Sequence, residues 1–143
     1  MEKLVAPTDH MRVIIVGSGH LGAWLATLLD TQGYRVTVIA PRSEGFERLG
    51  AGFTGATIVG SGGQTETLEQ AGIAEAQVLV ALTNHDTENL LISQMAKSLY
   101  QVPQVFCGLQ DPILKEVYQG LGLTIITRTE IEVQYFLDAI HRT

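Results

Sequence analysis

The chain has 143 residues, of which 45% are hydrophobic and 17% charged, which predicts one folded domain and excludes a disordered chain. Its formal net charge of −6 argues against a nucleic-acid partner, and no apolar run approaches the roughly 18–20 residues that a membrane helix needs. The single cysteine, Cys107, excludes an internal disulfide framework and fits a reducing compartment, so we expect a cytoplasmic protein without direct membrane insertion.

The chain divides into a short leading segment and one domain. Residues 1–11 are expected to be a flexible N-terminal segment, and they lack the apolar stretch of a signal peptide. Residues 12–143 are expected to form the domain, including a C-terminal helix. Its first strand, at residues 12–16, is nearly all apolar, which is typical of a strand buried on both faces.

Strand-like and helical segments alternate along the rest of the chain. Further strands are predicted at residues 35–39, 56–59, 78–82, 105–107 and 123–126. Helices are predicted at residues 20–32, 44–49, 65–70, 86–100, 112–119 and 130–141. The first helix carries Leu21, Leu25 and Leu28 on one face. This alternation predicts an α/β fold: a Rossmann-like, doubly wound parallel six-stranded sheet in a single domain.

A glycine-rich turn joins the first predicted strand to the first predicted helix. Its residues are Gly17, Ser18, Gly19, His20, Leu21 and Gly22. Gly17 permits a tight turn, Gly19 lets the backbone approach a diphosphate, and Gly22 lets the helix lie close to the strand. The helix N-terminus then offers N–H groups to phosphates, which predicts a site for an adenine nucleotide. A turn used only for packing is the alternative.

The residues after the second predicted strand depart from the usual dinucleotide pattern. An acid there normally binds the ribose hydroxyls, but this chain has Ala40, followed by Pro41 and Arg42. Glu44 lies too far into the next segment to be a clear substitute. Two interpretations remain open: Arg42, with Ser43, contacts a ribose 2′-phosphate, or Arg42 is a solvated loop residue and the ribose is held loosely.

Three further segments combine with the glycine turn into a more specific pattern. They are Ile58-Val59-Gly60 with Leu68 and Ala71-Gly72-Ile73, then Ala81-Leu82-Thr83 with Asp86 and Asn89-Leu90-Leu91, and finally Asp111-Pro112 ahead of a helix. From about residue 12 to residue 128 the chain resembles the TrkA-N family, the RCK or KTN nucleotide-binding domains that regulate potassium channels and transporters. The domain at residues 12–143 is therefore expected to be of this type.

The resemblance implies a ligand, a partner and further binding residues. The ligand would be ATP, ADP, AMP or a nicotinamide dinucleotide, NAD(P)(H). The partner would be a membrane potassium channel or transporter subunit, which would place the protein at the inner face of the cell membrane. Besides the glycine turn, the nucleotide-binding candidates are Ala40, Pro41, Arg42, Ser61, Gly62, Thr83 and Asn84.

Four positions depart from the side chains that the resemblance leads us to expect. His20 replaces an arginine in the glycine turn, and Ala40 replaces the ribose-binding acid. Ser61 replaces an aspartate beside the adenine, and Gly108 replaces an arginine near the phosphates. Phosphate binding through the backbone survives these changes, whereas ribose recognition and charge pairing are weakened.

No metal-binding or catalytic role is predicted for the other residues with reactive side chains. The histidines and Cys107 lack metal-ligand spacing, so no metal site is predicted, and Ser18 has no base to activate it, so no catalytic residue is predicted. Cys107 is expected to be a buried packing residue, and Trp24 to lie in the core or in a subunit interface. His20 either faces the phosphates, so that protonation strengthens binding, or is a neutral surface residue.

Three functions remain open on the sequence alone. The first is a regulatory nucleotide-sensing subunit of a potassium system, without turnover of its own. The second is a small NADP-dependent reductase, favoured by Ala40 and Arg42 but lacking room for a substrate domain. The third is an assembly subunit with a decayed nucleotide site.

The final helix carries large apolar residues on several sides, among them Ile131 and Phe136, which predicts a homo-oligomer; a monomer is the alternative.

Overall fold

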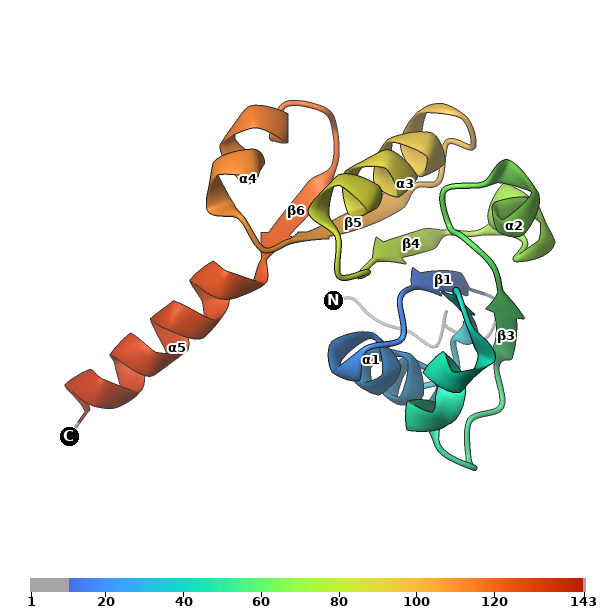
Figure 1. Ribbon diagram of the computed structural model, residues 1–143, viewed down its shortest axis with the longest axis horizontal. Coiled ribbons are helices and arrows are strands. Elements are labelled where there is room, and N and C mark those ends of the chain that lie inside the picture. The colour runs from blue at the N-terminus through green and yellow to red at the C-terminus, as the bar shows by residue number, and fades with distance from the viewer. Residues whose placement is uncertain (1–10, 143) are drawn as a thin grey trace.

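A single parallel sheet forms the centre of the computed structural model, which describes residues 11–142. The strands are β1 (Arg12–Val16), β2 (Arg35–Ala40), β3 (Ala56–Val59), β4 (Val78–Ala81), β5 (Gln104–Leu109) and β6 (Thr124–Thr127). Their order in the sheet is β3-β2-β1-β4-β5-β6, and every neighbouring pair is parallel (Figure 1). The order reverses between β1 and β4, which confirms the predicted doubly wound, Rossmann-like α/β fold. The predicted flexible segment lies, except for Met11, outside the described residues.

Helices cover both faces of this sheet. They are α1 (His20–Thr31), α2 (Thr65–Gln70), α3 (Asp86–Ser98), α4 (Pro112–Tyr118) and α5 (Arg128–His141), with two 3-10 helices, η2 (Ser43–Leu49) and η3 (Ile73–Glu75). Helices α1 and η2 pack on one face, and α2 and α3 on the other (Figure 1). The predicted helix at residues 44–49 is thus of the 3-10 type, and the last helix begins two residues earlier than predicted.

The central strand β1 contributes to two hydrophobic cores because its side chains alternate between the two faces of the sheet. Val13 and Ile15 pack in the core beneath α1, whereas Ile14 and Val16 pack in the core beneath α2 and α3. All four side chains are buried. Burial on both faces explains why the strand is almost entirely apolar, as predicted.

Small residues form the buried side of α1. Gly22, Ala23 and Ala26 face the sheet, whereas the predicted leucine face is largely outside the core, since Leu21 and Leu28 are exposed. Trp24 is 69% exposed, so it is not a core residue of the described chain. The predicted helix is therefore present, but its core-facing side consists of the small residues.

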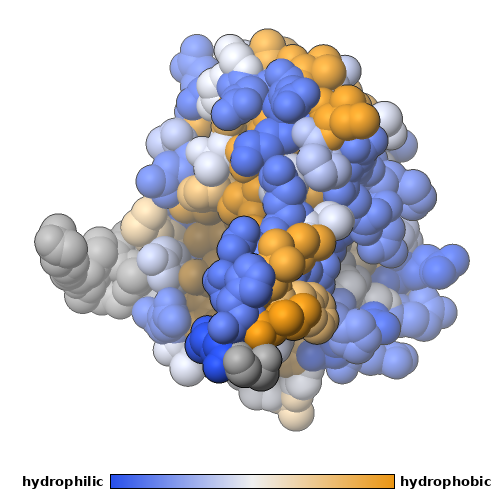
Figure 2. All heavy atoms as spheres, turned by 90° about the vertical axis from the view of Figure 1, so that its left-hand side faces the viewer, coloured by the Kyte–Doolittle hydropathy of each residue, from blue (hydrophilic) through white to orange (hydrophobic). Residues whose placement is uncertain are grey.

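Helix α5 extends away from the sheet (Figure 1). None of its 14 residues, all within the described part of the chain, is buried. Its exposed apolar residues are Ile131, Val133, Tyr135, Phe136, Leu137 and Ile140. Figure 2, which faces the free end of α5, shows hydrophobic side chains along one side of the helix and hydrophilic ones along the other. Among residues 11–142, no helix combines the length and apolar character needed to cross a membrane.

Candidate nucleotide-binding site

The glycine turn between β1 and α1 begins at a residue that must be glycine. Gly17 has a φ of 116°, a conformation that side chains disfavour, and a β-carbon there would collide with the carbonyl oxygen of Leu82. Its backbone N–H donates to the carbonyl of Ile39, at an N···O distance of 2.9 Å. Gly17 therefore holds the turn against the ends of β2 and β4, the two neighbours of β1.

The other two glycines of the turn meet opposite surroundings. A β-carbon on Gly22 would collide with the carbonyl oxygen of Gly17, so this glycine lets α1 start close to β1. Gly19 is the N-cap of α1, and no described atom would lie within 4 Å of a β-carbon there. The backbone at Gly19 thus borders open space, beside the first-turn N–H groups of α1, as a phosphate site requires.

A cleft of about 570 Å³ opens beside this turn, at the carboxyl ends of the central strands. That volume lies within the ordinary range for small-molecule sites, and the position is the point where the strand order reverses. The cleft brings together ten of the predicted residues: Gly17, Ser18, Gly19, Ala40, Pro41, Arg42, Ser61, Gly62, Thr83 and Asn84.

The remaining predicted residues, His20, Leu21 and Gly22, line a second cavity of about 750 Å³. This cavity lies between α1, the ends of β4 to β6, and the start of α5, where Ile131 contributes to its lining. Gly19, Arg48, Leu82 and Asn84 line both cavities. His20 is exposed and stands beside the glycine turn, on the side of the second cavity.

Four charged or titratable residues of the cleft were not among the predicted site residues: Glu44, Arg48, His85 and Glu88. Glu44 and Arg48 arrive with η2, which packs so closely that a β-carbon on Gly45 would collide with Ser18 Oγ. His85 is the N-cap of α3, and Glu88 lies in its first turn. Because a helix that follows a parallel strand begins at the strand's carboxyl end, the sequence already placed them near the site.

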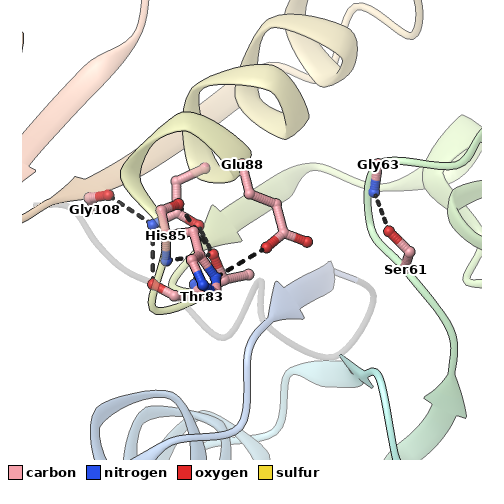
Figure 3. A network of polar contacts seen from close by, with 7 residues as sticks. Ser61, Gly63, Thr83, His85, Glu88 and Gly108 are labelled. Atoms are coloured by element: carbon pink, nitrogen blue, oxygen red, sulfur yellow. Dashed lines mark hydrogen bonds and ion pairs between the residues drawn. The ribbon is translucent and has the colours of Figure 1, made fainter.

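A buried amide fixes the loop that follows β4 (Figure 3). Asn89 Oδ1 accepts hydrogen bonds from the Thr83 backbone N–H, at 2.9 Å, and from Thr83 Oγ1, at 2.7 Å. Asn89 Nδ2 donates to the carbonyls of Thr83, at 3.1 Å, and Gly108, at 2.8 Å. The hydroxyl of Thr83 is therefore engaged within the protein, and this residue shapes the cleft through its backbone.

The carboxylate of Asp86 joins the same loop region to the end of β5. Asp86 accepts hydrogen bonds from the backbone N–H groups of Gln110, at 2.9 Å, and Asp111, at 3.0 Å. Asp111 in turn caps α4 by accepting from the N–H of Ile113. The segments that carried the family resemblance, around Thr83, Asp86, Asn89 and Asp111, thus hold the carboxyl edge of the sheet in shape.

The remaining polar groups of the cleft lie on opposite walls. His85 Nδ1 is 3.7 Å from Glu88 Oε1 on the α3 wall, whereas Ser61 Oγ accepts a hydrogen bond from the N–H of Gly63 (Figure 3). Arg42 and Arg48 lie on the η2 wall. The wall that follows β2 therefore carries two arginines and one acid, Glu44.

Cys107 and Gly108 of β5 stay out of the cleft. Cys107 is fully buried, which confirms the predicted packing role, and this burial raises the pKa of its thiol. Gly108 is buried, and a β-carbon there would lie 2.8 Å from Leu82 Cδ2. Within residues 11–142 no group of three histidine, cysteine or acidic side chains is placed to hold a metal ion.

Comparison with known proteins agrees with this geometry. The TrkA-N domain model matches residues 13–129, so the chain belongs to the TrkA-N domain family. Within that family, a relative is the Trk system potassium uptake protein TrkA of Streptomyces coelicolor, 36% identical over 116 residues, which are 81% of this chain and 52% of that protein. The chain spans about half to three-fifths of the length of the first curated relatives that it matches.

Solved structures share the fold at low sequence identity. The GsuK structure bound to ADP has a TM-score of 0.80 at 18% identity, covering 96% of this chain and 36% of that one. The Shewanella denitrificans Kef C-terminal domain in AMP-bound form has a TM-score of 0.74 at 23% identity, covering 91% of this chain and 79% of that one. At these identities the likeness establishes the fold.

Proposed function

We propose that this chain is a nucleotide-binding regulatory domain of a potassium uptake or channel system. The observation that carries the proposal is the cleft at the strand-order reversal, where Gly19 borders open space at the start of α1. The ligand is an adenine nucleotide, with its phosphates against the glycine turn. Family membership, and the ADP and AMP bound to similar folds, support this assignment.

The partner is a membrane potassium channel or transporter subunit, to which the domain attaches from the cytoplasmic side. The name of the Streptomyces relative, a potassium uptake protein, supports this partner and argues for regulation over the alternative reductase. The domain performs no turnover of its own. Nucleotide binding acts by favouring one of two arrangements of the assembled domains, and the favoured arrangement is transmitted to the pore.

The assembly itself is a homo-oligomer formed through α5. This helix leaves six large apolar residues exposed, and it projects away from its own sheet (Figure 1). The second cavity, lined by Leu21, Phe106 and Ile131, gives the same region a further apolar surface. Contiguous exposed apolar surface of this kind is typical of subunit contacts. In this assembly, α5 contacts a second copy of the chain.

A two-part experiment tests the proposal. Calorimetric titration of the purified chain with AMP, ADP, ATP, NADH and NADPH should detect at least one nucleotide that binds. Co-purification of the tagged chain from its native cell should recover a membrane potassium-transport subunit. If no nucleotide binds, the sensing function is wrong. If a nucleotide binds but no transport subunit is recovered, the assignment to potassium transport is wrong.

A further inference from the structure

The end of β2 lacks the acid that a ribose site usually has there. Ala40, the last residue of β2, is 1% exposed and brings no carboxylate to the cleft. Arg42 and Arg48 line the same cleft and are exposed. In this fold, an acid at the end of the second strand binds the ribose 2′-hydroxyl, whereas a nearby arginine accommodates a 2′-phosphate.

The position of η2 places Arg42 and Arg48 at the wall of the cleft that follows β2. A β-carbon on Gly45 would collide with Ser18 Oγ and lie 3.1 Å from the Ala40 β-carbon, so η2 packs directly on the glycine turn and the end of β2. Arg42 precedes this contact in extended backbone, with φ −141° and ψ 151°, and Arg48 follows it in the last turn of η2. The contact therefore lies between the two arginines in sequence.

The charge of these two arginines is available to a ligand. Among residues 11–142, neither Arg42 nor Arg48 forms an ion pair or a side-chain hydrogen bond. Of the two acids that line the cleft, Glu88 stands beside His85 on the α3 wall, and Glu44 lies in the first turn of η2. Glu44 is therefore the acid that could favour the opposite ligand. Its carboxylate could accept hydrogen bonds from the hydroxyls of a ribose that carries no 2′-phosphate.

We propose that the cleft selects an adenine nucleotide with a phosphate on the ribose 2′-oxygen, as in NADP⁺ and NADPH, and that Arg42 and Arg48 bind this phosphate. The inference rests on the proposed nucleotide site and adds the ligand class to it. Guanidinium groups bind phosphate oxygens through paired, charge-assisted hydrogen bonds. Two such groups, with no acid at the end of β2, favour the phosphorylated ribose over the free diol.

Small fragments of the nucleotide separate this proposal from its rivals. The full chain is titrated with 5′-AMP, 2′,5′-ADP and 3′,5′-ADP, and then with NADH and NADPH. We expect 2′,5′-ADP to bind roughly tenfold or more tightly than 5′-AMP, from which it differs only by the 2′-phosphate, and NADPH to exceed NADH by a similar factor. 3′,5′-ADP carries its ribose phosphate on the 3′-oxygen, as coenzyme A does, and it should show no comparable gain in affinity. The higher affinity for 2′,5′-ADP should decrease as the salt concentration is raised.

Matched variants assign the effect to side chains. Arg42→Ala and Arg48→Ala should each reduce the preference for 2′,5′-ADP, and Arg42→Lys should restore only part of it. Glu44→Gln removes the cleft carboxylate nearest in sequence to the two arginines, so it should strengthen the preference. Arg35→Ala is the control, because Arg35 is also an exposed arginine but lies at the opposite end of β2. Thermal unfolding of each variant checks that the fold is intact.

Each outcome of this experiment has one meaning. Equal binding of 5′-AMP and 2′,5′-ADP, or a loss of NADH binding in Glu44→Gln with no preference for NADPH, overturns the 2′-phosphate assignment but leaves the nucleotide site standing. A preference for 3′,5′-ADP, or an equal effect of Arg35→Ala, also overturns it. Failure of every nucleotide to bind removes the proposed function itself.

Discussion

The first turn of α1 at Gly22 packs against the carbonyl group of Gly17, closely enough to exclude a β-carbon on Gly22. Gly17, at the start of the same turn, has the positive φ that glycine tolerates. Gly19, between them, borders open space. The first and last glycines thus build the turn, whereas the middle one leaves room for a ligand, and the three positions should respond differently to substitution.

Gly22→Ala should destabilise the protein. Replacing glycine by alanine inside a helix ordinarily stabilises it by up to about 1 kcal/mol. Here the added methyl group meets the Gly17 carbonyl, and overpacking of this kind costs about 1–3 kcal/mol. Urea unfolding of the variant should therefore give a lower free energy of unfolding than the native chain. A stabilised Gly22→Ala protein would contradict the packing described here.

Gly19→Leu should abolish nucleotide binding and keep the fold. The new side chain meets no described atom within 4 Å of its β-carbon, so it extends toward the position of the diphosphate. Calorimetry measures the affinity, and urea unfolding shows whether the transition stays cooperative. Gly52→Leu is the control, since Gly52 also faces open space and lies outside the cleft. Unchanged affinity in Gly19→Leu would place the phosphates elsewhere.

Asn89→Ala should cost roughly 2 kcal/mol or more of the free energy of unfolding. The substitution leaves the backbone groups of Thr83 and Gly108 without their buried partner. Asn84→Ala, in the same loop but at an exposed position, should change stability by no more than about 0.5 kcal/mol. Urea denaturation of the two variants makes the comparison, and equal effects would refute the role assigned to Asn89.

Phe136→Asp should weaken self-association. Phe136 is 69% exposed on α5, and a charge there opposes burial against a second copy. Light scattering at micromolar concentration should find an oligomer for the native chain and a smaller species for the variant. Gln134→Glu is the control, because two residues apart on a helix lie on nearly opposite sides. A monomeric native chain would contradict assembly through α5.

Cys107 should make stability fall at alkaline pH. Burial raises the pKa of its thiol in the folded state, so the folded chain retains a proton that the unfolded chain loses above the ordinary thiol pKa of about 8.5. The thiol's contribution is complete below that pH and declines as pH rises through the folded-state pKa. Urea unfolding between pH 7 and pH 10 should show a shallower decline for Cys107→Ala, and parallel curves would rule the effect out.

The doubly wound parallel sheet was predictable from the sequence because strand-like segments alternate with helical ones along the chain. The glycine turn was predictable for the same reason, since its spacing lies directly between β1 and α1. The core-facing side of α1 was not evident, because Ala23 and Ala26 are buried while the larger Leu21 and Leu28 are exposed. Helical periodicity favoured the leucines because it weighs hydrophobicity and not the distance to the sheet.

The contribution of charged residues from η2 to the cleft could not be predicted from the sequence either. Arg42 stood next to the expected ribose position, but Glu44 and Arg48 reach the cleft only because η2 packs against Ser18. That contact depends on Gly45, which is needed for close packing against residues distant in the sequence. No local sequence pattern indicates such a role. In contrast, His85 and Glu88 follow β4 directly, and the rule that loops at strand carboxyl ends form the site would have found them.

The central position of β1 has a consequence for how the chain folds during synthesis. Val13 pairs with Val36 on one side and with Val78 on the other, so one edge of the strand stays open until the second half of the chain emerges. Pairing across such sequence separations is slow, and an open apolar edge invites association with other chains. The nascent first half is therefore not an independent folding unit. Its glycine turn also receives its opposite wall, from Thr83 to Glu88, only when β4 has closed that edge.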